Sequence, residues 1–159
     1  MRKGRYDSIP RRKSREFALQ VLYQLNITKK DVHKVVAQFL DHFSGEEEKV
    51  GTTRFRDDFM ERLVLGVLEH CKEIDRLIEK YSENWRLDRM TIIDRAILRM
   101  ATFELLYCGE IPPKVTLNEA IELGKRFGSE NSGSFINGIL DRIQNEVVHK
   151  SIETKPIAQ

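Results

Sequence analysis

The chain has 159 residues, of which 40% are apolar and 33% charged, and it contains only four prolines and nine glycines. No apolar run approaches the roughly 20 residues of a membrane-spanning helix. The two cysteines, Cys71 and Cys108, have the spacing of neither a disulfide framework nor a zinc site and fit a reducing cytosol. We therefore expect one cytoplasmic domain over residues 1–150, with no membrane association, and a disordered tail over residues 151–159.

Positive charge is concentrated at the N-terminus. Residues 1–15 carry a formal charge of +6 and the rest of the chain −4, for a net charge of +2. This asymmetry favours a polyanion as partner, although a solvated basic tail is an equally good reading of charge alone. Residues 1–10 lack an apolar anchor and are expected to form a flexible arm. The cations are Arg2, Lys3, Arg5, Arg11, Arg12, Lys13 and Arg15.

Apolar side chains recur at helical spacing in six segments. The segment 91–107 is apolar around most of its circumference, which is typical of a central helix. Within the long segment 55–81, Gly66 is expected to loosen the helix. No strand alternation is present, so we predict a compact all-α bundle of about six to seven helices in two packed sub-bundles, segments one to three and four to six. The segments are approximately 8–28, 31–43, 55–81, 91–107, 116–127 and 132–147.

Two helix starts and one helix end are marked by local chemistry. Thr91 with Asp94 resembles a capping box, and Thr116 with Glu119 matches the full pattern. Gly128 is a natural C-terminal stop. The sequence therefore predicts helices that begin at Thr91 and Thr116.

Two aromatic residues are candidates for contact with nucleobases. On a helical wheel Tyr23 points away from the apolar face of the segment 8–28. Phe135 lies at the edge of the last apolar face, beside the polar run 129–134. Bases of single-stranded RNA stack on such rings, while burial in the core is the alternative for both.

The sequence contains no motif for catalysis. The phosphate-binding, dinucleotide-binding, zinc-protease and serine-hydrolase patterns are all absent. The four histidines are not spaced as metal ligands on one face, and the carboxylates mostly alternate with Lys and Arg. We therefore predict a non-catalytic protein without cofactor or metal.

Three blocks carry a resemblance to a known family. Residues 11–23, residues 94–105 and the stretch from 114 to 141 occur in the order found in the NusB family, which they resemble. The resemblance implies a transcription antitermination factor that binds boxA RNA together with a small-subunit ribosomal protein, NusE. It further implies assembly with RNA polymerase and other Nus factors, in support of ribosomal RNA transcription.

The resemblance also implies which residues bind. Asn131 stands where family members often have an acid, so we expect a relatively competent RNA binder here. The expected RNA contacts are Arg2, Lys3, Arg5, Arg11, Arg12, Lys13, Arg15, Tyr23, Lys125, Asn131, Ser132, Phe135, Asn137 and Gly138. The expected partner contacts are exposed charges on or beside the central helix, namely Asp94, Arg95, Arg99, Glu104 and Lys114.

Two alternatives remain open at this point. Similar domains occur in ribosomal RNA cytosine methyltransferases, although 159 residues leave no room for a methyltransferase domain. A homodimer that hides its own RNA surface is the other alternative.

Overall fold

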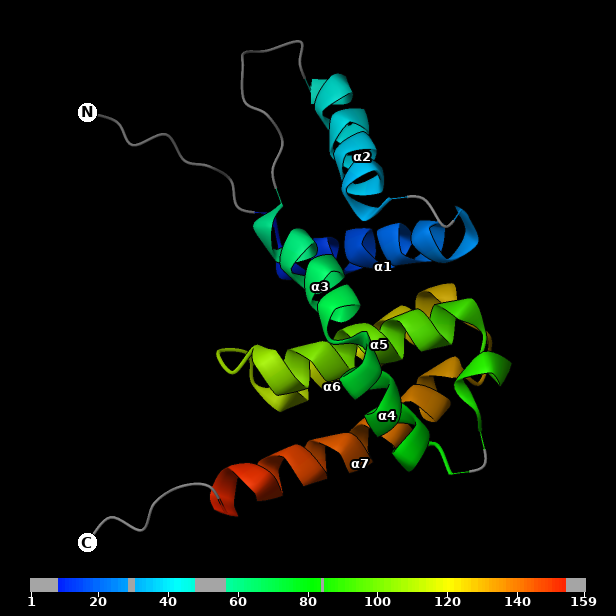
Figure 1. Ribbon diagram of the computed structural model, residues 1–159, viewed down its shortest axis with the longest axis vertical. Coiled ribbons are helices and arrows are strands. Elements are labelled where there is room, and N and C mark those ends of the chain that lie inside the picture. The colour runs from blue at the N-terminus through cyan, green and yellow to red at the C-terminus, as the bar shows by residue number, and fades with distance from the viewer. Residues whose placement is uncertain (1–8, 29–30, 48–56, 84, 154–159) are drawn as a thin grey trace, which may run out of the picture. The chain divides into compact units, whose positions relative to one another are not determined.

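The computed structural model describes residues 9–28, 31–47, 57–83 and 85–153. These residues form seven α-helices and one short 3-10 helix without strands, which confirms the all-α class (Figure 1). The elements are α1 (Arg11–Thr28), α2 (Val32–Glu47), α3 (Asp58–Glu69), α4 (Cys71–Tyr81), η1 (Leu87–Arg89), α5 (Ile92–Tyr107), α6 (Pro113–Phe127) and α7 (Ser132–Glu153).

The chain divides into two compact units, residues 1–62 and 63–159. The division falls within α3, so α4 belongs to the second unit. The sequence placed the whole segment 55–81 in the first group, and that boundary was wrong. A continuous apolar stripe shows that a segment is helical but does not show which neighbours it packs against.

In the first unit α1 packs against α2, and its expected apolar face is buried. Asp57 precedes α3 and accepts the Met60 amide at 2.9 Å as a helix cap. The same carboxylate oxygen accepts the Ser14 hydroxyl of α1 at 2.8 Å, and this bond is buried. One aspartate therefore starts α3 and joins it to α1. The buried apolar residues of α1 are Phe17, Ala18, Leu19, Val21 and Leu22.

The long segment 55–81 is two helices, broken at His70 and not at Gly66. His70 has φ −105° and ψ 18°, which ends α3 and starts α4. Gly66 lies inside the continuous helix, where an added Cβ would approach the Phe103 ring to 2.2 Å. The glycine therefore permits a close approach of α3 to α5, and the expected loosening there was wrong.

In the second unit α5 is the central helix, as predicted. It packs against α4, α6 and α7, and α6 also packs against α7. Burial on several sides explains why its sequence is apolar around most of its circumference. Its buried apolar residues are Ala96, Ile97, Leu98, Met100, Ala101 and Phe103.

One predicted cap is present and the other is not. The Thr91 hydroxyl accepts the Asp94 amide at 3.1 Å at the start of α5. However, α6 begins at Pro113, whose fixed φ suits a first turn. Thr116 is therefore inside α6, where its buried hydroxyl donates to Glu104 at 3.2 Å and joins α6 to α5. A tertiary bond has replaced the expected local one.

The ends of the last two helices are also decided by packing. Gly128 ends α6 as predicted, with extended backbone rather than a left-handed cap. A Cβ there would lie 2.3 Å from the Ser132 hydroxyl, so contact with α7 requires the glycine. The helix α7 continues to Glu153, so residues 151–153 are helical and not part of a disordered tail. No helix in the described part of the chain is both long and apolar enough to cross a bilayer.

Candidate nucleic-acid interface

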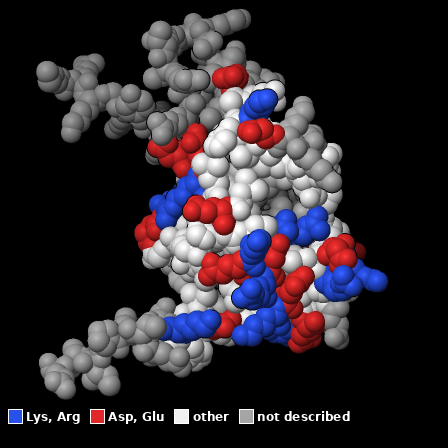
Figure 2. Space-filling model, in the orientation of Figure 1, with Lys and Arg blue, Asp and Glu red and all other residues white. Residues whose placement is uncertain are grey.

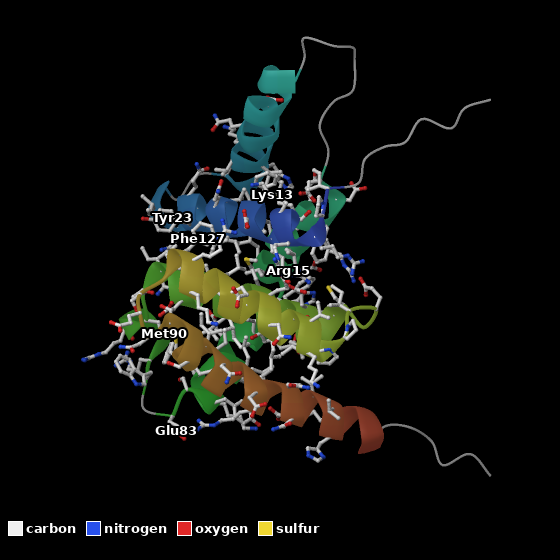
Figure 3. All side chains as sticks on the ribbon, turned by 180° about the vertical axis from the view of Figure 1, so that it is seen from behind. Lys13, Arg15, Tyr23, Glu83, Met90 and Phe127 are labelled. Atoms are coloured by element: carbon white, nitrogen blue, oxygen red, sulfur yellow. The ribbon has the colours of Figure 1, made fainter. Side chains whose placement is uncertain are left out.

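The first turn of α1 presents three cations to solvent. Arg11, Arg12 and Lys13 are exposed, and Lys13 lies 3.5 Å from the Glu16 carboxylate. Figure 3 shows Lys13 on α1. The first turn contains no acidic residue. Because the helix dipole is positive at this end, the three cations are placed unfavourably and would gain from a bound anion. Arg2, Lys3 and Arg5 lie outside the described residues.

Arg15 differs from the other cations of α1 because it is only 3% exposed. Its guanidinium carbon lies 5.3 Å from the centre of the Phe59 ring, and that of Arg11 lies 5.1 Å away. Residues four apart share a helix face, so both arginines reach the same ring. In this conformation Arg15 packs against Phe59 of the first unit, and its expected RNA contact stays a prediction.

Tyr23 points outward from α1, as the helical wheel predicted. Its side chain is 38% exposed, and it is eleven residues from Arg12, or about three helical turns. Leu19, one turn earlier, is 3% exposed. A cationic end and an aromatic ring therefore lie on one helix with phosphate-binding and base-stacking chemistry.

The end of α6, the connection after it and the start of α7 hold a second group of expected contacts. Lys125, Asn131, Asn137 and Gly138 are exposed, and Lys125 lies 3.5 Å from the Glu122 carboxylate. These side chains are accessible to a ligand.

Ser132 is the exception in this group because it is 1% exposed. Its hydroxyl accepts the Ser129 amide at 2.9 Å and so caps the turn before α7. In this conformation local hydrogen bonding occupies the Ser132 hydroxyl and packing encloses it, so its expected RNA contact stays a prediction.

Phe135 is half-buried at the edge of α7, as predicted, and has an aromatic neighbour that the sequence did not reveal. The Trp85 ring lies 6.0 Å from it, centre to centre, at an interplanar angle of 72°. Trp85 is 55% exposed. The only available signal was a single tryptophan in the polar connection after α4, and sequence separation hid the contact.

The residues expected to bind a protein partner are less exposed than predicted. Asp94 is 7% and Glu104 is 3% exposed, so both expectations of exposed charge were wrong. The reason is that the central helix is covered on the sides that carry them. Arg95 and Arg99 are half-buried, and only Lys114 is fully exposed.

Arg99 forms a two-point ion pair with Asp75. Its Nε lies 2.8 Å from one carboxylate oxygen, and its Nη2 lies 2.9 Å from the other. Cys71 lies beside them with its sulfur 3.5 Å from Asp75. Burial raises the pKa of the Cys71 thiol, which keeps it protonated at neutral pH and makes it a poor nucleophile. This group joins α4 to α5 and has the properties of a structural contact.

On the face shown in Figure 2, cationic and acidic side chains of the described residues are interspersed. The run of cations at the start of α1 therefore differs from that surface. No group of three or more His, Cys, Asp and Glu residues within the described ranges is arranged to hold a metal.

Comparison with known proteins identifies relatives along nearly the whole chain. The model of the NusB family matches residues 12–145. The transcription antitermination protein NusB of Syntrophus aciditrophicus is 45% identical over 148 residues, covering 93% of this chain and 87% of the relative. That of Bacillus subtilis is 44% identical over 137 residues, covering 86% and 96%.

Solved structures agree with this assignment. NusB of T. maritima has a TM-score of 0.76 and 37% identity, covering 92% of this chain and 99% of that one. A chain of a complex of the antitermination factors NusB and NusE with double-stranded RNA has a TM-score of 0.69 and 25% identity, covering 86% and 96%. The chain belongs to the NusB family.

Proposed function

We propose that this protein is a non-catalytic, cytoplasmic transcription antitermination factor. It binds boxA RNA together with the ribosomal protein NusE. The observation that carries the proposal is the close similarity to antitermination proteins, 45% and 44% identical over 87% and 96% of their own lengths. Because these relatives are matched nearly end to end, the alternative of a methyltransferase fragment is not favoured.

The surface chemistry of α1 supports RNA as the ligand. Arg11 and Arg12 can form paired hydrogen bonds with phosphate oxygens, and Lys13 adds a third positive charge. A phosphate at this helix end would also offset the unfavourable position of the cations. Tyr23 supplies a ring for a base further along the same helix.

In the second unit, Lys125, Asn131, Asn137 and Phe135 have the chemistry for RNA contacts of their own. The asparagine side chains can donate and accept at base edges, and Phe135 can stack. The backbone at Gly138 is uncovered, since nothing lies within 4 Å of an added Cβ. A strand of RNA can therefore approach this part of α7 closely.

Binding of short labelled RNAs at several salt concentrations tests the proposal. A boxA-like RNA should bind more tightly than a scrambled one, and NusE should strengthen the difference. The logarithm of affinity should fall with the logarithm of salt with a slope of roughly −3 to −5, which corresponds to several phosphate contacts. Equal and weak binding of both RNAs, with or without NusE, would reject the proposed function.

The partner surface and higher assemblies are further parts of the proposal. We infer that Lys114, Arg95 and Arg99 lie on or near the surface that meets NusE, and that the complex joins RNA polymerase with other Nus factors. Loss of NusE co-elution in a Lys114→Glu variant with unchanged RNA binding would support this surface. Light scattering addresses the homodimer, because a mass of twice 18.6 kDa that halves when RNA is added would reveal self-association through the RNA surface.

A further inference from the structure

Trp85 is exposed in a position that core packing does not explain. With 55% of its surface accessible, it is the most exposed of the large apolar side chains in the described ranges. Leaving a ring of this size in water forgoes a substantial part of its hydrophobic stabilisation. A large exposed aromatic side chain is a common feature of recognition surfaces.

Trp85 is joined to Ser82, just after α4, by two hydrogen bonds. The Trp85 amide donates to the Ser82 carbonyl at 3.2 Å, and the Ser82 hydroxyl donates to the Trp85 carbonyl at 2.5 Å. Glu83, between them, has a left-handed φ of 56°. These two bonds tie the backbone of Trp85 to the end of α4.

Arg142 of α7 contacts the same end of α4. Its guanidinium donates to the Tyr81 carbonyl at 3.1 Å and lies 2.8 Å from the Glu83 carboxylate. Phe135 is two helical turns before Arg142 on α7. The contacts of Arg142 and the edge-to-face pair of Trp85 with Phe135 therefore join the end of α4 and Trp85 to α7 within the second unit.

The surroundings of the ring suit a nucleotide. Arg86 follows Trp85 directly and its side chain is 76% exposed. It lies 3.4 Å from the carboxylate of Asp88, which is itself 65% exposed. Such an exposed ion pair contributes little, so Arg86 can exchange it for a phosphate at small cost. A ring with an adjacent exposed guanidinium is a combination that binds a base and its phosphate.

We propose that Trp85 and Phe135 form a two-ring platform on which a base of single-stranded RNA stacks, with Arg86 contacting the neighbouring phosphate. This inference rests on the proposed function and extends its RNA surface to the turn between α4 and η1. A ring face attracts any base, so the platform contributes affinity more than sequence preference.

Trp85 is the only tryptophan of the chain, so its fluorescence reports on this site directly. Titration with the boxA-like RNA should quench the emission along the same binding curve that the anisotropy of labelled RNA gives. An RNA series with one abasic nucleotide at each position should contain one member that binds without this quenching.

Variants separate a contact from mere proximity. Trp85→Ala should weaken RNA binding about tenfold, and Trp85→Phe, which keeps a ring, should restore most of the affinity. Arg86→Gln should make the slope of affinity against salt less steep by about 0.7. Leu68→Ala, which removes another exposed apolar side chain of the second unit, should bind RNA like the wild type. Thermal unfolding of each variant verifies that the fold is intact.

The outcomes distinguish this inference from the proposed function. If the wild type binds boxA-like RNA selectively without a change in its tryptophan emission, and Trp85→Ala binds this RNA equally well, the platform is wrong and the proposed function stands. If Trp85→Ala binds RNA normally but loses NusE, the exposed ring belongs to a protein interface and the platform is likewise wrong. If the wild type binds no RNA selectively, the proposed function fails first.

Discussion

Arg11 and Arg15 show how much four positions along a helix can matter. Both guanidinium groups lie over the Phe59 ring, yet Arg11 is exposed and Arg15 is 3% exposed. A charge count at the N-terminus treats the two as equal. The structure leaves Arg11 available for a phosphate and gives Arg15 a packing role.

The absence of a negative charge at Asn131 is expected to favour RNA binding. The side chain is exposed at the turn before α7. Asn131→Asp should therefore weaken binding of a boxA-like RNA several-fold, because it places a carboxylate beside phosphates, and the loss should shrink as salt rises. Anisotropy titrations at low and high salt measure the effect. Asn145→Asp, an exposed substitution further along α7, is the control, and equal losses in the two variants would contradict the assignment.

The outward direction of Tyr23 followed from helical periodicity, because the wheel depends on one helix only. The burial of Ser132, Asp94 and Glu104 did not follow, because each is enclosed or bonded by another segment. Polar residues are usually exposed, so composition favours the wrong answer wherever a neighbouring helix covers them. The periodicity of one helix thus predicts which way a side chain points. Packing against other segments decides whether that side chain is accessible to solvent.

Between elements, the crossing of α3 and α5 depends on Gly66. Phe103 is 5% exposed, and its ring stacks on that of Tyr107 with 5.4 Å between the ring centres. The Phe103 ring therefore has little freedom to move away from an added methyl group. Gly66→Ala should lower the free energy of unfolding by about 1–3 kcal/mol. Gly138→Ala, on an open face of α7, should instead raise it by about 0.5–1 kcal/mol. Denaturant unfolding of both variants measures the contrast, and a stabilised Gly66→Ala protein would refute the close approach.

The contact of α4 with α7 makes stability depend on pH. Hydrogen bonding to the Tyr81 hydroxyl, with Lys150 and Lys80 each 3.2 Å away, lowers the pKa of Glu146 from 4.5 to about 2. A folded-state pKa below the unfolded one stabilises the protein above about pH 4.5, and this stability is lost as pH falls towards 2. Since both lysines are well exposed, we expect the ionised Glu146 carboxylate to contribute about 1 kcal/mol to the free energy of unfolding.

Glu146→Gln tests this dependence by removing the charge while keeping the shape. The variant should be less stable than the wild type at pH 6, and the difference should narrow steadily between about pH 4.5 and pH 2. Urea unfolding across this range provides the measurement. A difference that stays constant at every pH would mean that the carboxylate charge contributes nothing to the contact of α4 with α7.

Over the whole molecule, the uneven charge is expected to govern how RNA binding responds to salt. Arg12→Gln with Lys13→Gln should make the slope less steep by about 1.4, since each lost phosphate contact on a single strand removes about 0.7. Lys72→Gln with Arg76→Gln removes the same charge from exposed positions of α4. If both double variants change the slope equally, net charge rather than the α1 cations controls binding.

The sequence by itself determined the helical class, the central place of α5, the basic N-terminus and the outward Tyr23, because each depends on periodicity or composition within one segment. Only the tertiary structure decided the break at His70, the bond between Thr116 and Glu104, and the pairing of Trp85 with Phe135. The last two features join residues of different segments, and a single sequence does not give the distance between such residues. The part of the candidate site built on one helix could therefore be predicted, and the part built by two segments required the fold.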